Sequence, residues 1–151
     1  NDTVIAQLRS MGIVYARTTR STHKFSLPDD FMQWHPTCHH RDALTDADAF
    51  LGSFDGYFST PRLFYVWGHS YEFDGKDNWQ RIEDFAEKMG GREDVWYATN
   101  IEIYDYLDAY NHLLFSLDGS FVHNPTATTV WFCREGKIFS VAPGETLTLS
   151  D

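Results

Sequence analysis

The chain has 151 residues, a length typical of a single domain, and 22 Asp and Glu against 12 Lys and Arg give it a formal net charge of −10 at pH 7. This balance argues against nucleic-acid binding, and since no apolar stretch approaches the ~18 residues of a spanning helix, we expect no membrane contact. Aromatic residues make up 17% of the chain, more than a small core requires, which indicates a surface or groove suited to sugars or to another protein.

The N-terminal segment has the pattern of a helix followed by a strand. Asn1 or Asp2 can cap a helix that runs to about Met11, and Gly12 is a suitable stop. Residues 13–16 then predict a buried strand. Because the helical pattern starts at once and without an initiator Met, we expect a fragment or processed product of a larger bacterial protein, either cytoplasmic or secreted.

The densest group of potential ligand residues is His35-Pro36-Thr37-Cys38-His39-His40, which follows a short helical turn expected after Pro28. Two histidines four residues apart on a helix can share a metal ion, but Pro36 disfavours a helix here, so the spacing does not by itself indicate a metal site. A loop can still turn His39 or His40 inward. Three interpretations stay open for this loop: metal ligation, a substrate contact, and a solvated surface.

A long apolar run lies near the middle of the chain. It follows a helix expected over residues 43–51 and an aromatic loop over residues 52–61, and it reads Leu63-Phe64-Tyr65-Val66-Trp67-Gly68-His69. Such a run is typical of a strand buried on both faces of a parallel sheet. A strand that ends this way delivers His69 to the carboxyl edge of the sheet, where ligands bind in α/β proteins.

The residues around His69 suit a functional site. Gly68 leaves room for a ligand to approach the backbone, and Ser70, Tyr71 and Glu72 follow with hydroxyl groups and a carboxylate. The alternative is that His69 only caps the strand and bonds to a loop carbonyl.

Helix and strand alternate as far as residue 110. We expect a helix over residues 79–89, a strand over residues 95–98 and a helix over residues 100–110 that Thr99 or Asn100 caps. This alternation predicts an α/β fold with parallel strands.

The last forty residues change character to short strands, expected over residues 113–115, 129–133, 137–141 and 146–149. Arg134-Glu135-Gly136 predicts a hairpin turn. We therefore expect an α/β domain over residues 1–111 and an antiparallel β-strand extension over residues 112–151 packed on it.

Four phrases resemble the carboxyl-terminal half of a NodB-like polysaccharide deacetylase, a class of carbohydrate esterases. They are Ser10-Met11-Gly12-Ile13-Val14-Tyr15-Ala16-Arg17-Thr18, His35-Pro36-Thr37-Cys38-His39-His40, Phe64-Tyr65-Val66-Trp67-Gly68-His69-Ser70-Tyr71-Glu72-Phe73 and Val95-Trp96-Tyr97-Ala98-Thr99-Asn100-Ile101-Glu102. The resemblance covers about residues 1–110, and the tail resembles the β-extension of one bacterial branch. It implies the C-terminal part of a distorted (β/α) barrel with a small antiparallel β appendage.

The resemblance implies metal-dependent hydrolysis of acetyl groups on a bacterial or host glycan, with Zn²⁺ or Co²⁺ as the cofactor of the intact parent protein. The phrase that ends in His69 fits the family's last motif, whose histidine protonates the leaving amine. Glu72 is a candidate partner of His69 by proximity. Trp67, Tyr71 and Trp34 are candidates for stacking on sugar rings. Further substrate contacts are expected from His39, His40 and Arg17.

The chain lacks two other motifs of this family. The Thr-Phe-Asp-Asp-Gly phrase that supplies the catalytic base is absent from the sequence, and so is the His-x-x-x-His pair that follows that phrase and binds the metal with it. The spacing of His35 and His39 lies instead in the loop that contains Pro36. We therefore expect this chain alone to be inactive, and to associate with the N-terminal half of the parent protein or with itself.

Two other functions stay open. One is a non-catalytic carbohydrate-binding or assembly module. The other is a stand-alone metal-dependent hydrolase that uses His35, His39 and His69.

Overall fold

The computed structural model describes residues 1–53 and 61–149. The chain divides into two compact units, Asn1–Trp96 and Tyr97–Asp151. Each unit mixes helices with small sheets, and the described residues form no closed barrel. A partial barrel and a domain boundary after residue 111 remain predictions. Most of the aromatic loop expected over residues 52–61 lies outside the described residues.

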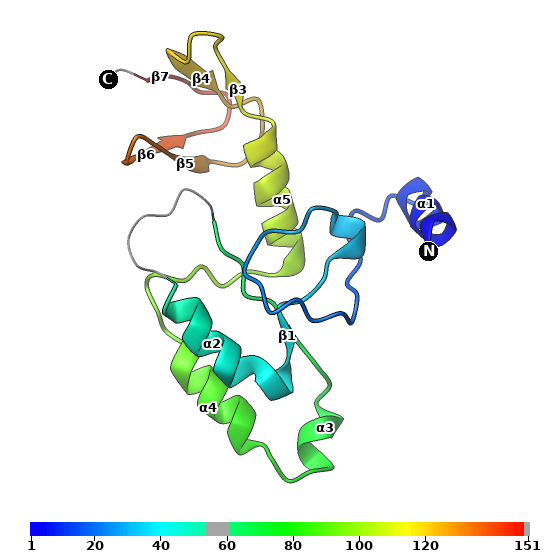
Figure 1. Ribbon diagram of the computed structural model, residues 1–151. Coiled ribbons are helices and arrows are strands. Elements are labelled where there is room, and N and C mark those ends of the chain that lie inside the picture. Colours follow the sequence, from blue (N-terminus) through cyan, green and yellow to red (C-terminus); the bar gives the residue numbers. More distant parts are fainter. Residues whose placement is uncertain (54–60, 150–151) are drawn as a thin grey trace. The chain divides into compact units, whose positions relative to one another are not determined.

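The described residues of the first unit form four α-helices, two single 3-10 turns and one parallel pair of short strands, and Figure 1 shows their arrangement. In chain order these are α1 Asp2–Ser10, η1 Phe31–Gln33, β1 Cys38–His39, η2 His40–Asp42, α2 Ala43–Leu51, β2 Val66–Trp67, α3 Tyr71–Asp74 and α4 Gln80–Met89. The helices expected near residues 1–11, 43–51 and 79–89 are confirmed. Asn1 caps α1 by accepting from the amide of Val4, as its sequence position predicted.

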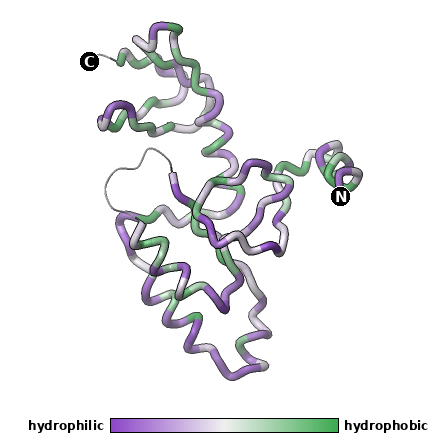
Figure 2. The backbone as a smooth tube through the Cα atoms, viewed as in Figure 1, coloured by the Kyte–Doolittle hydropathy of each residue, from purple (hydrophilic) through white to green (hydrophobic). Residues whose placement is uncertain are grey.

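Helices α2 and α4 pack side by side (Figure 1) and contribute to a hydrophobic cluster of this unit. The cluster is built from Ala47, Phe50 and Met89, with Phe64 and Phe85 partly buried against it. Hydrophobic and hydrophilic residues both recur along each of these helices (Figure 2). This is the amphipathic pattern that predicted them.

The expected strands of the first unit are much shorter than the apolar runs that predicted them. Residues 63–67 are half-buried and not buried on both faces, and only Val66–Trp67 forms a strand. Residues 13–16 and 95–98 form no strand. The first of these segments still has sheet-like hydrogen bonds, from Ala16 N to Phe31 O (2.9 Å) and from Trp34 N to Ala16 O (3.0 Å). A strand becomes regular where a neighbouring strand pairs with it along its length, and the described residues supply few such partners in this unit.

The second unit begins with α5 Asn100–Asn111, and its N-terminus is the expected one. Thr99 accepts from the amide of Glu102, and the Glu102 carboxylate accepts from the amide of Thr99, which makes a complete capping box. The Glu102 carboxylate also accepts from the hydroxyl of Thr99, and the hydrogen bonds from this hydroxyl and from the Thr99 amide hold the pKa of Glu102 below its usual value.

As far as residue 149, where the described residues end, five strands follow α5 in two antiparallel sheets. They are β3 Leu114–Phe115, β4 Phe121–His123, β5 Val130–Arg134, β6 Lys137–Val141 and β7 Thr146–Thr148, in the orders β3-β4-β7 and β5-β6. Four of them lie where the sequence predicted strands, and β4 was not expected. The predicted hairpin is confirmed: Glu135 and Gly136 have φ values of 54° and 79° and join paired strands, as a type I′ turn requires.

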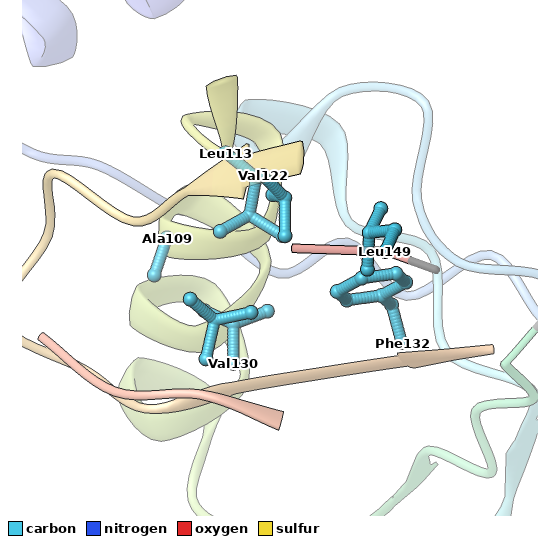
Figure 3. Packing of buried hydrophobic residues seen from close by; sticks show 7 residues of the cluster. Ala109, Leu113, Val122, Val130, Phe132 and Leu149 are labelled. Atoms are coloured by element: carbon cyan, nitrogen blue, oxygen red, sulfur yellow. The ribbon is translucent and has the colours of Figure 1, made fainter. Parts of the chain in front are cut away.

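Figure 3 shows the core of this unit, to which α5 and both sheets contribute. Val122 and Val130 are fully buried there, together with Ala109, Leu113, Phe132, Val141 and Leu149. Within the described part of the chain, no helix is long and apolar enough to cross a membrane.

Candidate functional site

The parallel pairing of β1 with β2 brings two histidine-containing segments to one edge. Cys38 pairs with Val66 and His39 pairs with Trp67, so both strands end at the same level. Thr37 supports this register, because its amide donates to Tyr65 O at 2.8 Å while its hydroxyl accepts from Tyr65 N at 3.0 Å. Parallel strands present their carboxyl ends to the same side, and the chain continues there into His40 and into Gly68-His69.

The carboxylate of Glu72, in the first turn of α3, lies at the centre of the histidines at this edge. One oxygen, Oε2, is 2.9 Å from His39 Nε2 and also contacts His40 Nε2. The other oxygen, Oε1, is 3.4 Å from His69 Nδ1. We call these four residues, His39, His40, His69 and Glu72, the histidine–carboxylate cluster.

The three histidines of the cluster differ in their access to solvent. The side chains of His39 and His40 are 11% and 7% exposed, whereas that of His69 is 45% exposed. Glu72 is therefore held from the buried side by two imidazoles, and it presents its second oxygen to a third imidazole that solvent and ligands can reach.

Gly68 makes room for the ring of His40. A Cβ atom at Gly68 would lie 3.0 Å from His40 Cγ and closer still to Cδ2, whereas real side chains keep greater distances. The ring of Phe73 packs on the imidazole ring of His40, with centroids 4.3 Å apart. The sequence suggested that Gly68 admits a ligand, but the group that approaches its backbone is His40.

Burial and hydrogen bonding shift the pKa values of two members of the cluster. The hydrogen bond from His40 holds the pKa of Glu72 below its usual value, and this outweighs the opposing effect of partial burial. Burial lowers the pKa of His39, with a further contribution from the neighbouring His40, although the Glu72 carboxylate acts in the opposite direction. Glu72 is therefore ionised at neutral pH and accepts hydrogen bonds from the imidazoles around it.

Aromatic side chains border the exposed imidazole. The ring of Tyr71, itself 68% exposed, stacks on that of His69 with centroids 5.0 Å apart and planes 25° apart. Trp67 is half-buried and meets His39 edge-on, with centroids 4.9 Å apart. The guanidinium of Arg17 lies 4.7 Å from the centroid of the Trp67 ring, close enough for a cation–π contact.

The structure thus brings together the seven residues that the sequence singled out: His69 and Glu72 with His39 and His40 in the cluster, and Trp67, Tyr71 and Arg17 beside it. Trp34 is different. It is 1% exposed, and its ring packs against Tyr15 and Tyr65, so the expectation that it stacks on a sugar is wrong.

His35 does not join the cluster. Its Nδ1 lies 2.6 Å from the hydroxyl of Thr18, and among the described residues the group with metal-ligand geometry is His39, His69 and Glu72. One ligand atom from each of these three residues lies within 4.8 Å of the others. The ligand set expected for a stand-alone hydrolase, with His35 as its third member, is therefore not the one that the structure assembles.

Sequence reasoning missed Thr37 and Phe73, which fix the strand register and the ring of His40. Phe73 stands directly after Glu72 and could have been noticed as an apolar residue facing the site. Thr37 gave no signal, because its role depends on a strand pairing that the sequence does not announce.

No protein-family model, curated protein or solved structure matches the chain. The site is therefore interpreted from its own geometry.

Proposed function

We propose that the chain is part of a metal-dependent polysaccharide deacetylase that hydrolyses acetyl groups on a bacterial or host glycan. In this proposal the chain supplies the general acid, His69, and part of the substrate groove. The observation that carries it is the environment of His69: the imidazole is accessible, and it faces a carboxylate that two buried histidines hold in place.

His69 would protonate the nitrogen that leaves when the acetyl group is cleaved. A proton donor must reach the substrate, and among the three histidines of the cluster His69 is the most exposed. Glu72, whose pKa is lowered by the hydrogen bond from His40, is ionised at neutral pH, and its Oε1 lies 3.4 Å from His69 Nδ1. Glu72 would therefore orient the ring and stabilise the positive charge of a proton-donating imidazole.

The residues beside His69 suit a sugar. Tyr71 offers an exposed ring face, and Trp67 with the guanidinium of Arg17 forms a second flat surface next to the cluster. Carbohydrate rings have apolar faces that pack on aromatic rings, so the two surfaces would position the acetylated residue with its nitrogen near His69.

The catalytic base and the metal-binding motif of the proposed family are absent from this sequence. When bound, the divalent cation of such enzymes polarises the acetyl carbonyl and activates water. The metal-competent group of the described residues does not fit that role, because it includes His69, the proposed proton donor. The base and the catalytic cation would come from a longer protein or from a partner chain.

The role of His69 can be tested by its replacement in the longer protein. We expect His69→Ala to lower kcat on acetylated chitooligosaccharides roughly 10²–10⁴-fold, the usual contribution of a positioned acid, with little change in the thermal midpoint. His112→Ala is the matched control, because His112 is also an exposed histidine beside a carboxylate, 3.5 Å from Asp108. The 151-residue chain alone should show no turnover with added Zn²⁺ or Co²⁺.

Two results would contradict the proposal. The first is near-normal kcat in a folded His69→Ala protein. The second is turnover by the isolated chain that persists through repurification and follows its concentration.

A second candidate function is carbohydrate binding without catalysis, and the exposed stack of Tyr71 on His69 favours it. In that case chitooligosaccharides would bind the chain, and Tyr71→Ala would weaken this binding. Even a longer form of the protein would then fail to hydrolyse them. Measuring binding and turnover on the same preparation separates the two functions.

A further inference from the structure

The histidine–carboxylate cluster has the composition of a transition-metal site. Two imidazoles and one carboxylate, from His39, His69 and Glu72, offer ligand atoms within 4.8 Å of one another. Nitrogen from histidine and oxygen from glutamate are ligands that Zn²⁺ accepts, and sets of two histidines and one glutamate leave its fourth position open. We propose that these three residues bind a divalent transition metal, with Zn²⁺ as the best match, and that this chain alone forms the site.

The spacing of the ligand atoms supports tetrahedral binding. Bonds of about 2.0–2.2 Å to a tetrahedral Zn²⁺ place neighbouring ligand atoms about 3.4 Å apart. Glu72 Oε2 lies 2.9 Å from His39 Nε2, near this value, whereas the 3.4 Å contact of His69 Nδ1 is with the other carboxylate oxygen, Oε1. One ion would therefore bind between His39 and Oε2, and the carboxylate or the ring of His69 would turn to bring the third ligand atom, already within 4.8 Å, to the same ion.

His40 prepares the carboxylate for this role. It is buried at 7% exposure, and its Nε2 contacts Oε2 of Glu72 from the side away from solvent. Hydrogen bonds of this kind orient metal ligands, and their loss commonly weakens metal affinity about 10–100-fold. The orientation of the carboxylate is thus fixed before any ion arrives, while the side of the cluster at His69 stays open for a water ligand.

An ion at this site would regulate the proposed enzyme by inhibition. Bound metal engages both His69 and Glu72, the residues proposed to donate and stabilise the transferred proton. Turnover of the longer protein would therefore fall as the site fills. This consequence rests on the proposed function, whereas metal binding itself does not.

The test is titration of the 151-residue chain with Zn²⁺ by calorimetry, and with Co²⁺ by visible absorption, which reports the coordination geometry. We expect one ion to bind with saturation. Glu72→Gln, which keeps the shape of the side chain and removes its charge, and His69→Ala, which removes an exposed ligand, should each weaken binding at least about tenfold. Circular dichroism checks that both variants are folded. If Glu72→Gln does not fold, the Zn²⁺ affinity of His69→Ala alone tests the proposal.

His112→Ala is the matched control and should bind as the unaltered chain does, because the pair of His112 and Asp108 is not part of the metal-competent group. The proposal is overturned if no saturable binding occurs, if His69→Ala binds normally, or if His112→Ala loses as much affinity. Saturable Zn²⁺ binding by the unaltered chain that His69→Ala weakens, together with an unimpaired kcat of His69→Ala in the longer protein, would overturn the proposed function and leave the metal site standing. No saturable Zn²⁺ binding, together with a strongly lowered kcat of His69→Ala, would overturn the metal site and leave the proposed function standing.

Discussion

At the scale of single residues, the contact between Gly68 and His40 decides the shape of the site. A methyl group at Gly68 would overlap the imidazole of His40, which is buried and cannot move away without leaving Glu72. We expect Gly68→Ala to destabilise the fold by about 1–3 kcal/mol, the usual cost of overpacking. Denaturant unfolding followed by circular dichroism measures this.

Gly75→Ala provides the comparison. Gly75 ends α3 at φ −65°, and an added Cβ would lie 3.3 Å from the carbonyl oxygen of Tyr71. An alanine there should stay within about 1 kcal/mol of the unaltered chain, since its backbone is compatible with a side chain. Equal stability of Gly68→Ala and the unaltered chain would show that the His40 ring has another position available.

The sequence predicted some residues of the site and not the contacts among them. His69 could be found because an apolar run ends there, and Glu72 because it stands three residues later. The convergence of His39 and His40 on the same carboxylate depends on the pairing of β1 with β2, which joins segments nearly thirty residues apart. No local pattern encodes that pairing, so the sequence singled out His39 and His40 but not their contacts with Glu72.

At the scale of elements, the helix caps give a direct prediction. Thr99→Ala removes the hydroxyl that accepts from the amide of Glu102, and α5 packs against β5 in the core of the second unit. We expect the free energy of unfolding to fall by about 1 kcal/mol. Asn1→Ala removes the same kind of cap from α1, a helix with no buried residue, and should have little effect on the unfolding of the remainder.

Equal effects of the two substitutions would contradict this reasoning, because they would show that the stability of a cap does not depend on how its helix is packed. Urea unfolding midpoints measured side by side on both variants make the comparison.

Helices were easier to predict than strands because the signals that specify a helix are local in the sequence. The caps of α1 and α5 and the apolar faces of α2 and α4 are local, so the sequence is sufficient to place these helices. The apolar runs at residues 13–16 and 95–98 predict strands only on the condition that neighbouring strands pair with them. β4 was missed for a related reason: Phe121–His123 is short, and it becomes a strand by lying between β3 and β7.

At the scale of the whole molecule, apolar surface remains where the sequence predicts a buried strand. Ile13 and Val14 are 43% and 38% exposed. Just after them, Ala16 and Thr18 form sheet-like hydrogen bonds with Phe31 and Trp34. Exposed β-branched residues beside such a ladder are typical of an edge that pairs with another chain. We therefore infer that this segment contacts the N-terminal half of a longer protein or, in the isolated chain, a second copy.

Sedimentation equilibrium tests the inference on the isolated chain. We expect concentration-dependent association, and Val14→Glu should shift the chain toward monomer because it places a charge in the paired edge. Val4→Glu is the matched control: Val4 is also an exposed valine, 48% exposed, but it lies on α1 and outside the predicted strand. If Val4→Glu disrupts association and Val14→Glu does not, α1 is the contact and strand pairing is wrong. A chain that stays monomeric over a wide range of concentration would rule out both contacts, because neither surface would then hold two copies together.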